Sequence, residues 1–111
     1  MNRLPMSPAA AALFRALLAR RPADRDRILL TNYRTIEWQS LTFVGERHEF
    51  RFRIAGPEAD AAFDRLTNGI DEVEFPLSGH VVADIGLNGD PAHEPDGSIG
   101  FGVEALTIRS D

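Results

Sequence analysis

The feature that most constrains the fold is the strict alternation of two kinds of side chain over positions 46–54. His48, Phe50, Phe52 and Ile54 fall on one side of an extended chain, and every residue between them is charged. Successive side chains of a β-strand point to opposite faces, so this period of two indicates a strand with one buried face. Such a strand requires a sheet that is covered on one side.

A glycine just before this strand suggests where its partner strand turns back. Gly45-Glu46 fits a two-residue type II′ turn, which has Gly at its first central position. A hairpin closed there predicts the pairs Leu41 with Phe50, Phe43 with His48, Trp38 with Arg53 and Ser40 with Arg51. Glu37 and Gln39 would then point to the apolar side, which predicts a bulge near Gln39 or an exposed strand end.

The same alternation returns on both sides of a polar loop at residues 88–97. The alternating apolar residues are Val81, Ala83, Ile85 and Leu87 before the loop, and Ile99, Phe101, Val103 and Ala105 after it. Pairing Leu87 with Ile99 gives an unbroken apolar face, whereas a slip by one residue mixes that face with Gly and Glu104. This register predicts a second hairpin.

Two segments have the spacing of amphipathic helices. In residues 7–20, Ser7 can cap the helix and Pro8 suits its first position. A second helix follows Pro57, with Ala59, Ala62, Phe63 and Leu66 on its apolar side, and ends at Asn68-Gly69. Residues 23–33 fit either a short helix or the start of a strand. The pattern of residues 70–75 predicts a short strand that ends at Pro76.

These elements predict one α+β domain over residues 1–111. An N-terminal helix at 7–21 precedes a ββαββ core at 34–111, in a two-layer sandwich with a mostly antiparallel sheet of about four strands. A chain of 111 residues, 43% of them hydrophobic, is long enough for one core. No apolar run reaches the ~18 residues of a membrane span, and we expect a cytoplasmic bacterial protein.

Composition excludes several chemistries. The chain has no Cys, and all 12 of its basic residues are Arg, so thiolate and lysine chemistry are absent. No cofactor or metal motif occurs, since the acidic loop around His93 lacks calcium-loop spacing. The net charge of −5 divides unevenly, into +5 for residues 1–55 and −10 for residues 56–111. We expect the two halves to pair with each other.

Three polar residues are the candidates for a ligand site. The predicted register of the second hairpin places His80, Asp84 and Glu104 together on the polar face of the sheet, with glycines between them. Such a patch fits a small ligand. The same residues would serve an alternative hypothesis, a small acid-base enzyme built on carboxylates and His80, provided that they share a deep pocket.

A second alternative is a weak nucleic-acid-binding protein. Trp38, Arg51 and Arg53 on one strand face could stack a base and contact phosphates. The cluster could be extended by other basic residues, namely Arg15, Arg20, Arg21, Arg25 and Arg27. A net acidic chain with a sequence pI near 5.1 argues against this alternative.

The leading hypothesis is a binding or assembly module that associates with itself. Leu106 and Ile108 fall on the same face as Asp84 and Glu104, opposite the predicted core. An uncovered apolar sheet face favours a partner. The sequence therefore predicts a homodimer that forms through the sheet or through its last strand.

Overall fold

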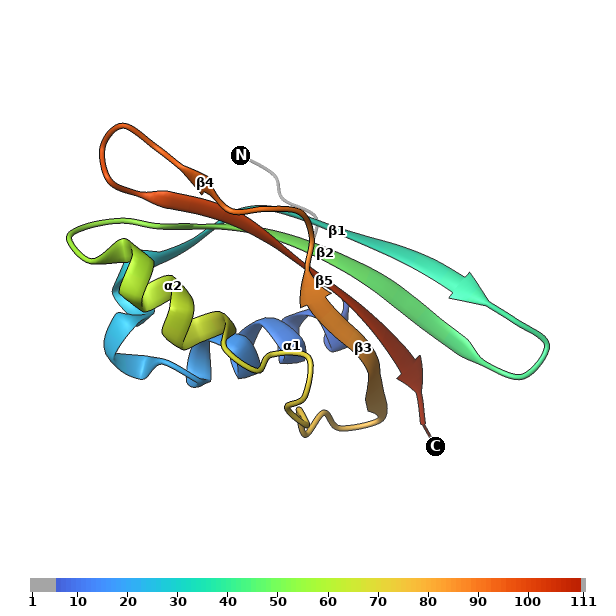
Figure 1. Ribbon diagram of the computed structural model, residues 1–111. Coiled ribbons are helices and arrows are strands. Elements are labelled where there is room, and N and C mark those ends of the chain that lie inside the picture. Colours follow the sequence, from blue (N-terminus) through green and yellow to red (C-terminus); the bar gives the residue numbers. More distant parts are fainter. Residues whose placement is uncertain (1–5, 111) are drawn as a thin grey trace.

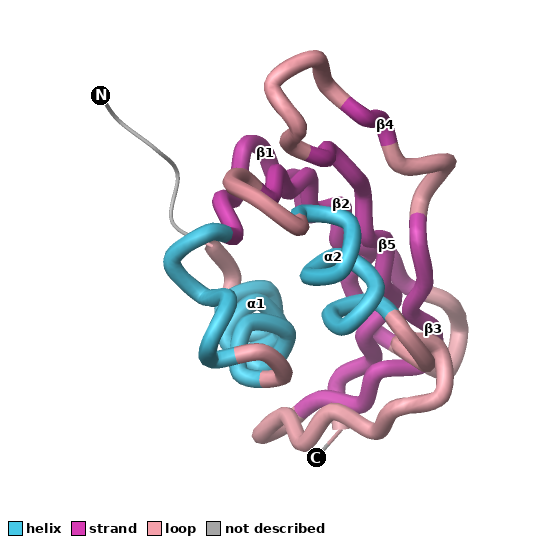
Figure 2. The backbone as a smooth tube through the Cα atoms, turned by 60° about the vertical axis from the view of Figure 1, so that its left-hand side comes forward, coloured by secondary structure: helices cyan, strands magenta, loops and turns pink. Residues whose placement is uncertain are grey.

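The computed structural model describes residues 6–110 and has two layers (Figure 1). One layer is an antiparallel sheet, and two helices lie side by side against one of its faces (Figure 2). The elements in chain order are α1 (Pro8–Ala19), a 3-10 helix η1 (Pro22–Arg27), β1 (Ile28–Gln39), β2 (Val44–Ile54), α2 (Ala59–Thr67), β3 (His80–Leu87), β4 (Ala92–His93) and β5 (Ile99–Arg109). The predicted α+β sandwich is confirmed.

Both predicted helices are present. Ser7 caps α1, because its hydroxyl accepts a hydrogen bond from the Ala10 amide at 3.1 Å, and Pro8 occupies the first turn. In α2 the predicted stripe is buried, with Ala62 at 0% and Leu66 at 2% exposure. The predicted strand at 70–75 is wrong: these residues form turns and coil, and Ile70 contributes to the core without strand pairing.

The segment left open at 23–33 divides at Ile28. Its first part is η1, and β1 begins directly after it. The buried carboxylate of Asp24 in η1 accepts hydrogen bonds from Arg65 of α2 at 3.1 Å, and Arg27 lies 3.6 Å away. This ion pair joins η1 to α2, so the connection between α1 and the sheet is fixed to the helix layer.

The sheet has the strand order β1-β2-β5-β3, with β4 paired to the far part of β5. The last strand is therefore interior, because β5 pairs with β2 on one side and with β3 and β4 on the other. The sequence suggested a dimer through the sheet or through its last strand. The last strand offers no free edge for pairing with a second copy. The sheet face remains.

The predicted turn of the first hairpin is wrong. The chain reverses at residues 40–43, where the Ser40 amide bonds to the Phe43 carbonyl at 2.8 Å, and Trp38 pairs with Gly45 rather than with Arg53. Gly45 lies inside the strand because its surroundings admit no side chain. A Cβ atom there would lie 2.9 Å from the Trp38 indole and 2.3 Å from the Thr107 carbonyl oxygen.

The predicted register of the second hairpin is also wrong. Leu87 pairs with Val103, not with Ile99, because β4 folds back from the loop and occupies the positions opposite Ile99 and Gly100. An irregularity between Val82 and Asp84 then shifts the alternation of β3 by one residue. As a result Ile85 is buried, whereas Val81 is 53% exposed.

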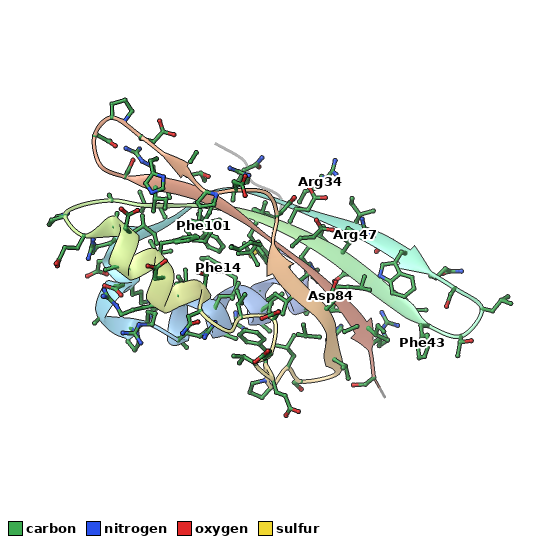
Figure 3. The ribbon with its side chains drawn as sticks, viewed as in Figure 1. Phe14, Arg34, Phe43, Arg47, Asp84 and Phe101 are labelled. Atoms are coloured by element: carbon green, nitrogen blue, oxygen red, sulfur yellow. The ribbon has the colours of Figure 1, made fainter. Side chains whose placement is uncertain are left out.

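An aromatic cluster fills the space between the layers. Phe14 of α1 stacks on Phe50 and Phe52, with ring centroids 6.4 and 6.2 Å apart. Phe101 packs against Phe52 at 5.4 Å and meets Phe63 of α2 edge to face at 4.9 Å. Figure 3 shows Phe14 and Phe101 between helices and sheet, as the alternation in β2 and β5 predicted for the buried face.

The helices leave one end of the sheet uncovered. Twelve residues of α1 extend about 18 Å at the helical rise. The twelve residues of β1 extend about 40 Å. The turn end of β1 and β2 therefore projects beyond both helices (Figure 1). We call this part, from Arg34 to Arg47 together with its neighbours in β3 and β5, the overhang.

The close packing at Gly45 gives a first prediction. Gly45→Ala should destabilise the fold by about 1–3 kcal/mol, because the new methyl group overlaps a backbone carbonyl that cannot move without disturbing β5. Urea unfolding measures this. Gly86→Ala is the matched control, since a Cβ there meets nothing within 4 Å and should change the free energy of unfolding by less than ~0.5 kcal/mol. Equal effects of the two substitutions would contradict the prediction.

Candidate functional site

The overhang has two different faces. The inner face continues the side of the sheet on which the helices pack, and the outer face looks away from them. Paired residues of neighbouring strands share a face, so the register assigns each side chain. Thr35, His48 and Thr107 lie on the inner face, and Ile36, Arg47 and Leu106 lie on the outer one. We take the overhang as the candidate site because its outer face is uncovered and its inner face borders the first turn of α1.

The structure separates the three predicted ligand residues. Asp84 pairs with Leu106 and Glu104 pairs with Gly86, so both carboxylates lie on the outer face. His80 pairs with Arg109 and lies on the inner face, because the irregularity between Val82 and Asp84 reverses the alternation. The expected patch of His80, Asp84 and Glu104 on one face is therefore wrong, although its two acids remain diagonal neighbours.

The structure also separates the residues of the nucleic-acid alternative. Trp38 pairs with Gly45, six residues along β2 from Arg51, which corresponds to about 20 Å. Arg53 is engaged with Asp96 and Ser98. In the helix layer, Arg20 donates to the carbonyl groups of Leu66 and Asn68. Arg20 is thus engaged at the end of α2, and Arg27 is engaged with the carbonyl groups of Ala55 and Pro57 in the loop before α2.

The outer face of the overhang carries an apolar patch. Ile36 is 40% exposed and Val81 53% exposed, and both lie at the turn end of the sheet. The register places three more apolar side chains beside them, namely Trp38, Leu106 and Ile108. These five residues are the outer patch. Ile36, Trp38, Arg47 and Leu106 line a shallow hollow within it.

Charges of both signs border the outer patch. Arg47 lies between Ile36 and Leu106 and is 3.6 Å from the Glu104 carboxylate. One row further from the turn, Arg34 bonds to Glu49 at 3.1 Å. Arg34 and Arg47 extend from the sheet on the side away from the helices (Figure 3). The outer patch is therefore an apolar surface bordered by charges of both signs rather than a basic surface.

The inner face of the overhang forms a cleft of about 490 Å³ beside the start of α1. Glu37 and Glu46, which pair across β1 and β2, lie at one side of it. His80 and Arg109, which pair across β3 and β5, lie at the other side. Ser7, the residue that caps α1, donates a hydrogen bond to Glu46 at 2.8 Å and so ties the helix to this end of the sheet.

A buried histidine lies between the aromatic core and the cleft. His48 has no exposed surface, and its Nδ1 and Nε2 atoms are 3.1 Å and 2.9 Å from the hydroxyl groups of Thr35 and Thr107. Thr107 donates in turn to the Glu46 carbonyl, so its oxygen accepts from His48 Nε2–H and Nδ1 accepts from Thr35. The sequence pattern placed His48 on the apolar side of its strand. The structure shows complete burial and threonine partners.

Burial lowers the pKa of His48, because the charged imidazolium loses its hydration inside the sheet. The Glu46 carboxylate, 3.9 Å from Nε2, opposes this shift, and His80 adds to it. His48 is consequently held in its neutral form, the form that allows one ring nitrogen to donate and the other to accept.

Residues 6–110 hold neither a cluster of metal-binding side chains nor a helix of membrane-spanning length and apolarity. This part of the chain contains no cluster of three or more His, Asp or Glu side chains that is suited to a metal ion. In the acidic loop, His93 instead contacts Asp60 of α2 at 2.7 Å. No helix within these residues has the length and apolarity needed to cross a membrane.

Comparison with known proteins adds no functional assignment. The chain matches no protein-family model, and no curated protein is significantly similar to it. The geometry of the overhang is therefore the basis for the functional argument.

The buried histidine gives a second prediction. His48 has a folded-state pKa below the value of about 6.5 expected in the unfolded chain. Between these two values the unfolded state binds the proton and the folded state does not, so stability is complete above about pH 6.5 and decreases as the pH falls. Urea unfolding from pH 7.5 to 5.5 should show this decrease, and His48→Gln should flatten it. An equal pH slope in both proteins would contradict the assignment.

Proposed function

We propose that the protein is a self-associating assembly module in which two copies stack through the outer faces of their sheets. The observation that carries this proposal is the outer patch. Its members Ile36 and Val81 are 40% and 53% exposed, and they adjoin Trp38, Leu106 and Ile108 on a face that no helix covers. A contiguous apolar surface on the sheet of a small protein is typical of an interaction site.

A second copy is the occupant that the charges favour. Arg47 stands among the apolar residues, and Glu104 and Asp84 stand on the neighbouring strands of the same face. A two-fold axis brings each surface against its own copy, so an arginine of one protomer can face a carboxylate of the other and the reverse. A surface with both signs of charge suits itself better than it suits a strongly charged partner such as nucleic acid.

The available area is also adequate. The outer face measures about 19 by 36 Å, from four strands at about 4.8 Å spacing and the eleven residues of β2. Its area is roughly 700 Å² if the extra surface of protruding side chains is left out. A stable dimer of standard size buries about 800 Å² on each partner. Stacking of the two outer faces therefore supplies an interface of the usual size.

The third prediction tests this interface directly. The protein should sediment as a dimer at micromolar concentration, and Ile36→Asp should weaken dimerisation at least ~10-fold by placing an unpaired charge in an apolar contact. Leu87→Asp is the matched control. Leu87 is also a strand residue of similar exposure, 42% against 40%, but its position opposite Val103 puts it on the other face. A monomeric wild-type protein at ~100 μM, a concentration at which even weak dimers form, would refute the proposal.

A charge exchange gives the fourth prediction. Arg47→Glu should weaken the dimer, since each protomer then adds one acidic group to the Asp84 and Glu104 carboxylates of the two copies. Adding Glu104→Arg restores the original balance of one basic and two acidic groups, Asp84 included, and should recover most of the dimer affinity. Sedimentation equilibrium at two salt concentrations measures both. No recovery in the double variant would show that these charges do not face each other across the interface.

A further inference from the structure

We propose that the cleft on the inner face of the overhang binds a small zwitterion, a molecule that carries one ammonium group and one carboxylate. The charged residues of the cleft lie on the opposite face of the sheet from Ile36, Leu106 and Val81, and Trp38 of the outer patch also lines the cleft. It has a volume of about 490 Å³, which is enough for a molecule of amino-acid size.

One side of the cleft is suited to a cation. Glu37 and Glu46 are direct partners across β1 and β2, and both line the cleft. Like charges placed opposite each other on antiparallel strands destabilise a sheet. Ser7 donates a hydrogen bond to Glu46, but Glu37 forms no ion pair with any residue in the described part of the chain. An ammonium group between the two carboxylates would relieve their repulsion.

The other side of the cleft is suited to a carboxylate. Arg109 and His80 are direct partners across β5 and β3. Arg109 forms no ion pair with residues 6–110, and its guanidinium can hold a carboxylate by two parallel hydrogen bonds. His80 adds a ring nitrogen at the same side.

The strand order keeps the two sides apart. The acids are on β1 and β2, whereas the bases are on β5 and β3, and Arg109 is two residues beyond the residue that pairs with Glu46. Diagonal neighbours of this kind are about 7–8 Å apart, with their Cβ atoms somewhat closer, and no ion pair joins Glu46 to Arg109 among residues 6–110. The fold therefore presents separated charges of opposite sign across one cleft. A ligand with both charges satisfies each side, and a ligand with one charge leaves the other side unpaired.

The test compares three probes with the same four-carbon skeleton, which are γ-aminobutyrate, butylammonium and butyrate. Each is titrated into isotope-labelled protein, and binding is followed through the amide NMR signals of cleft residues. We expect γ-aminobutyrate to bind at least ~10-fold more tightly than either singly charged probe, since each charge-assisted contact contributes about tenfold in affinity. Glycine, a shorter zwitterion, tests the separation of the two groups.

Two substitutions test which side of the cleft binds the ammonium group and which side binds the carboxylate. Glu37→Gln should weaken γ-aminobutyrate and butylammonium about tenfold and leave butyrate unchanged, whereas Arg109→Gln should weaken γ-aminobutyrate and butyrate and leave butylammonium unchanged. Glu72→Gln and Arg15→Gln are matched controls, because both residues are exposed and outside the cleft. Unchanged amide spectra away from the cleft show that each variant is folded.

Three outcomes would overturn the proposal. They are the absence of signal changes at the cleft up to about 10 mM probe, equal affinity for zwitterion and single ions, and variants that affect all probes alike. Probe binding by a protein that sediments as a monomer would support the cleft and refute only the dimer.

Discussion

The rest of the structure depends on the different rise of a helix and a strand. Twelve residues make α1 about 18 Å long, and twelve residues make β1 about 40 Å long. A helix layer made from segments this short cannot cover strands this long. The part of the sheet under the helices becomes the core, and the part beyond them becomes the overhang with two accessible faces. The elongated shape of the molecule, 47 × 34 × 23 Å, reflects the same mismatch.

The inner face changes chemistry where helix cover ends. Phe50 and Phe52 lie under α1 and pack with it. His48 follows toward the turn, buried but polar, and Glu46 comes next and lines the cleft. Each of these residues keeps its partner: an aromatic ring for phenylalanine, threonine hydroxyls for His48 and the helix cap Ser7 for Glu46. Polarity thus rises along one face of a single strand toward its turn end, although exposure to water rises only at Glu46.

Sequence reasoning predicted what depends on local periodicity. The buried face of β2, both helices and the order of the main elements follow from spacing and caps.

The predicted strand registers were wrong because registers depend on contacts between distant segments. Gly45 has the residue type of a turn, yet it is required by the Trp38 indole and by the β5 backbone. The pairing of β3 depends on the two-residue strand β4, which occupies positions opposite Ile99 and Gly100 and has no periodic signal of its own. The separation of His80 from Asp84 follows from one irregularity in β3. A signal for the outer patch was present in Leu106 and Ile108, whereas Ile36 could be placed beside them only from the true register.

The charged side chains of the basic half and the acidic half take part in several kinds of contact. Arg47 with Glu104 and Arg53 with Asp96 join the basic half to the acidic half as the sequence predicted. The most buried pair has the opposite sense, since Asp24 belongs to the basic half and Arg65 to the acidic one. Arg20 and Arg27 bind backbone carbonyl groups at the end of α2 and in the loop before it. Arginine suits all these roles because its planar group donates in several directions and stays charged near low-dielectric surroundings. Internal contacts therefore employ most of the basic side chains near the core. At the overhang, where association and ligand binding are proposed, Arg34 and Arg47 pair with exposed or partly exposed glutamates, and Arg109 forms no ion pair with residues 6–110.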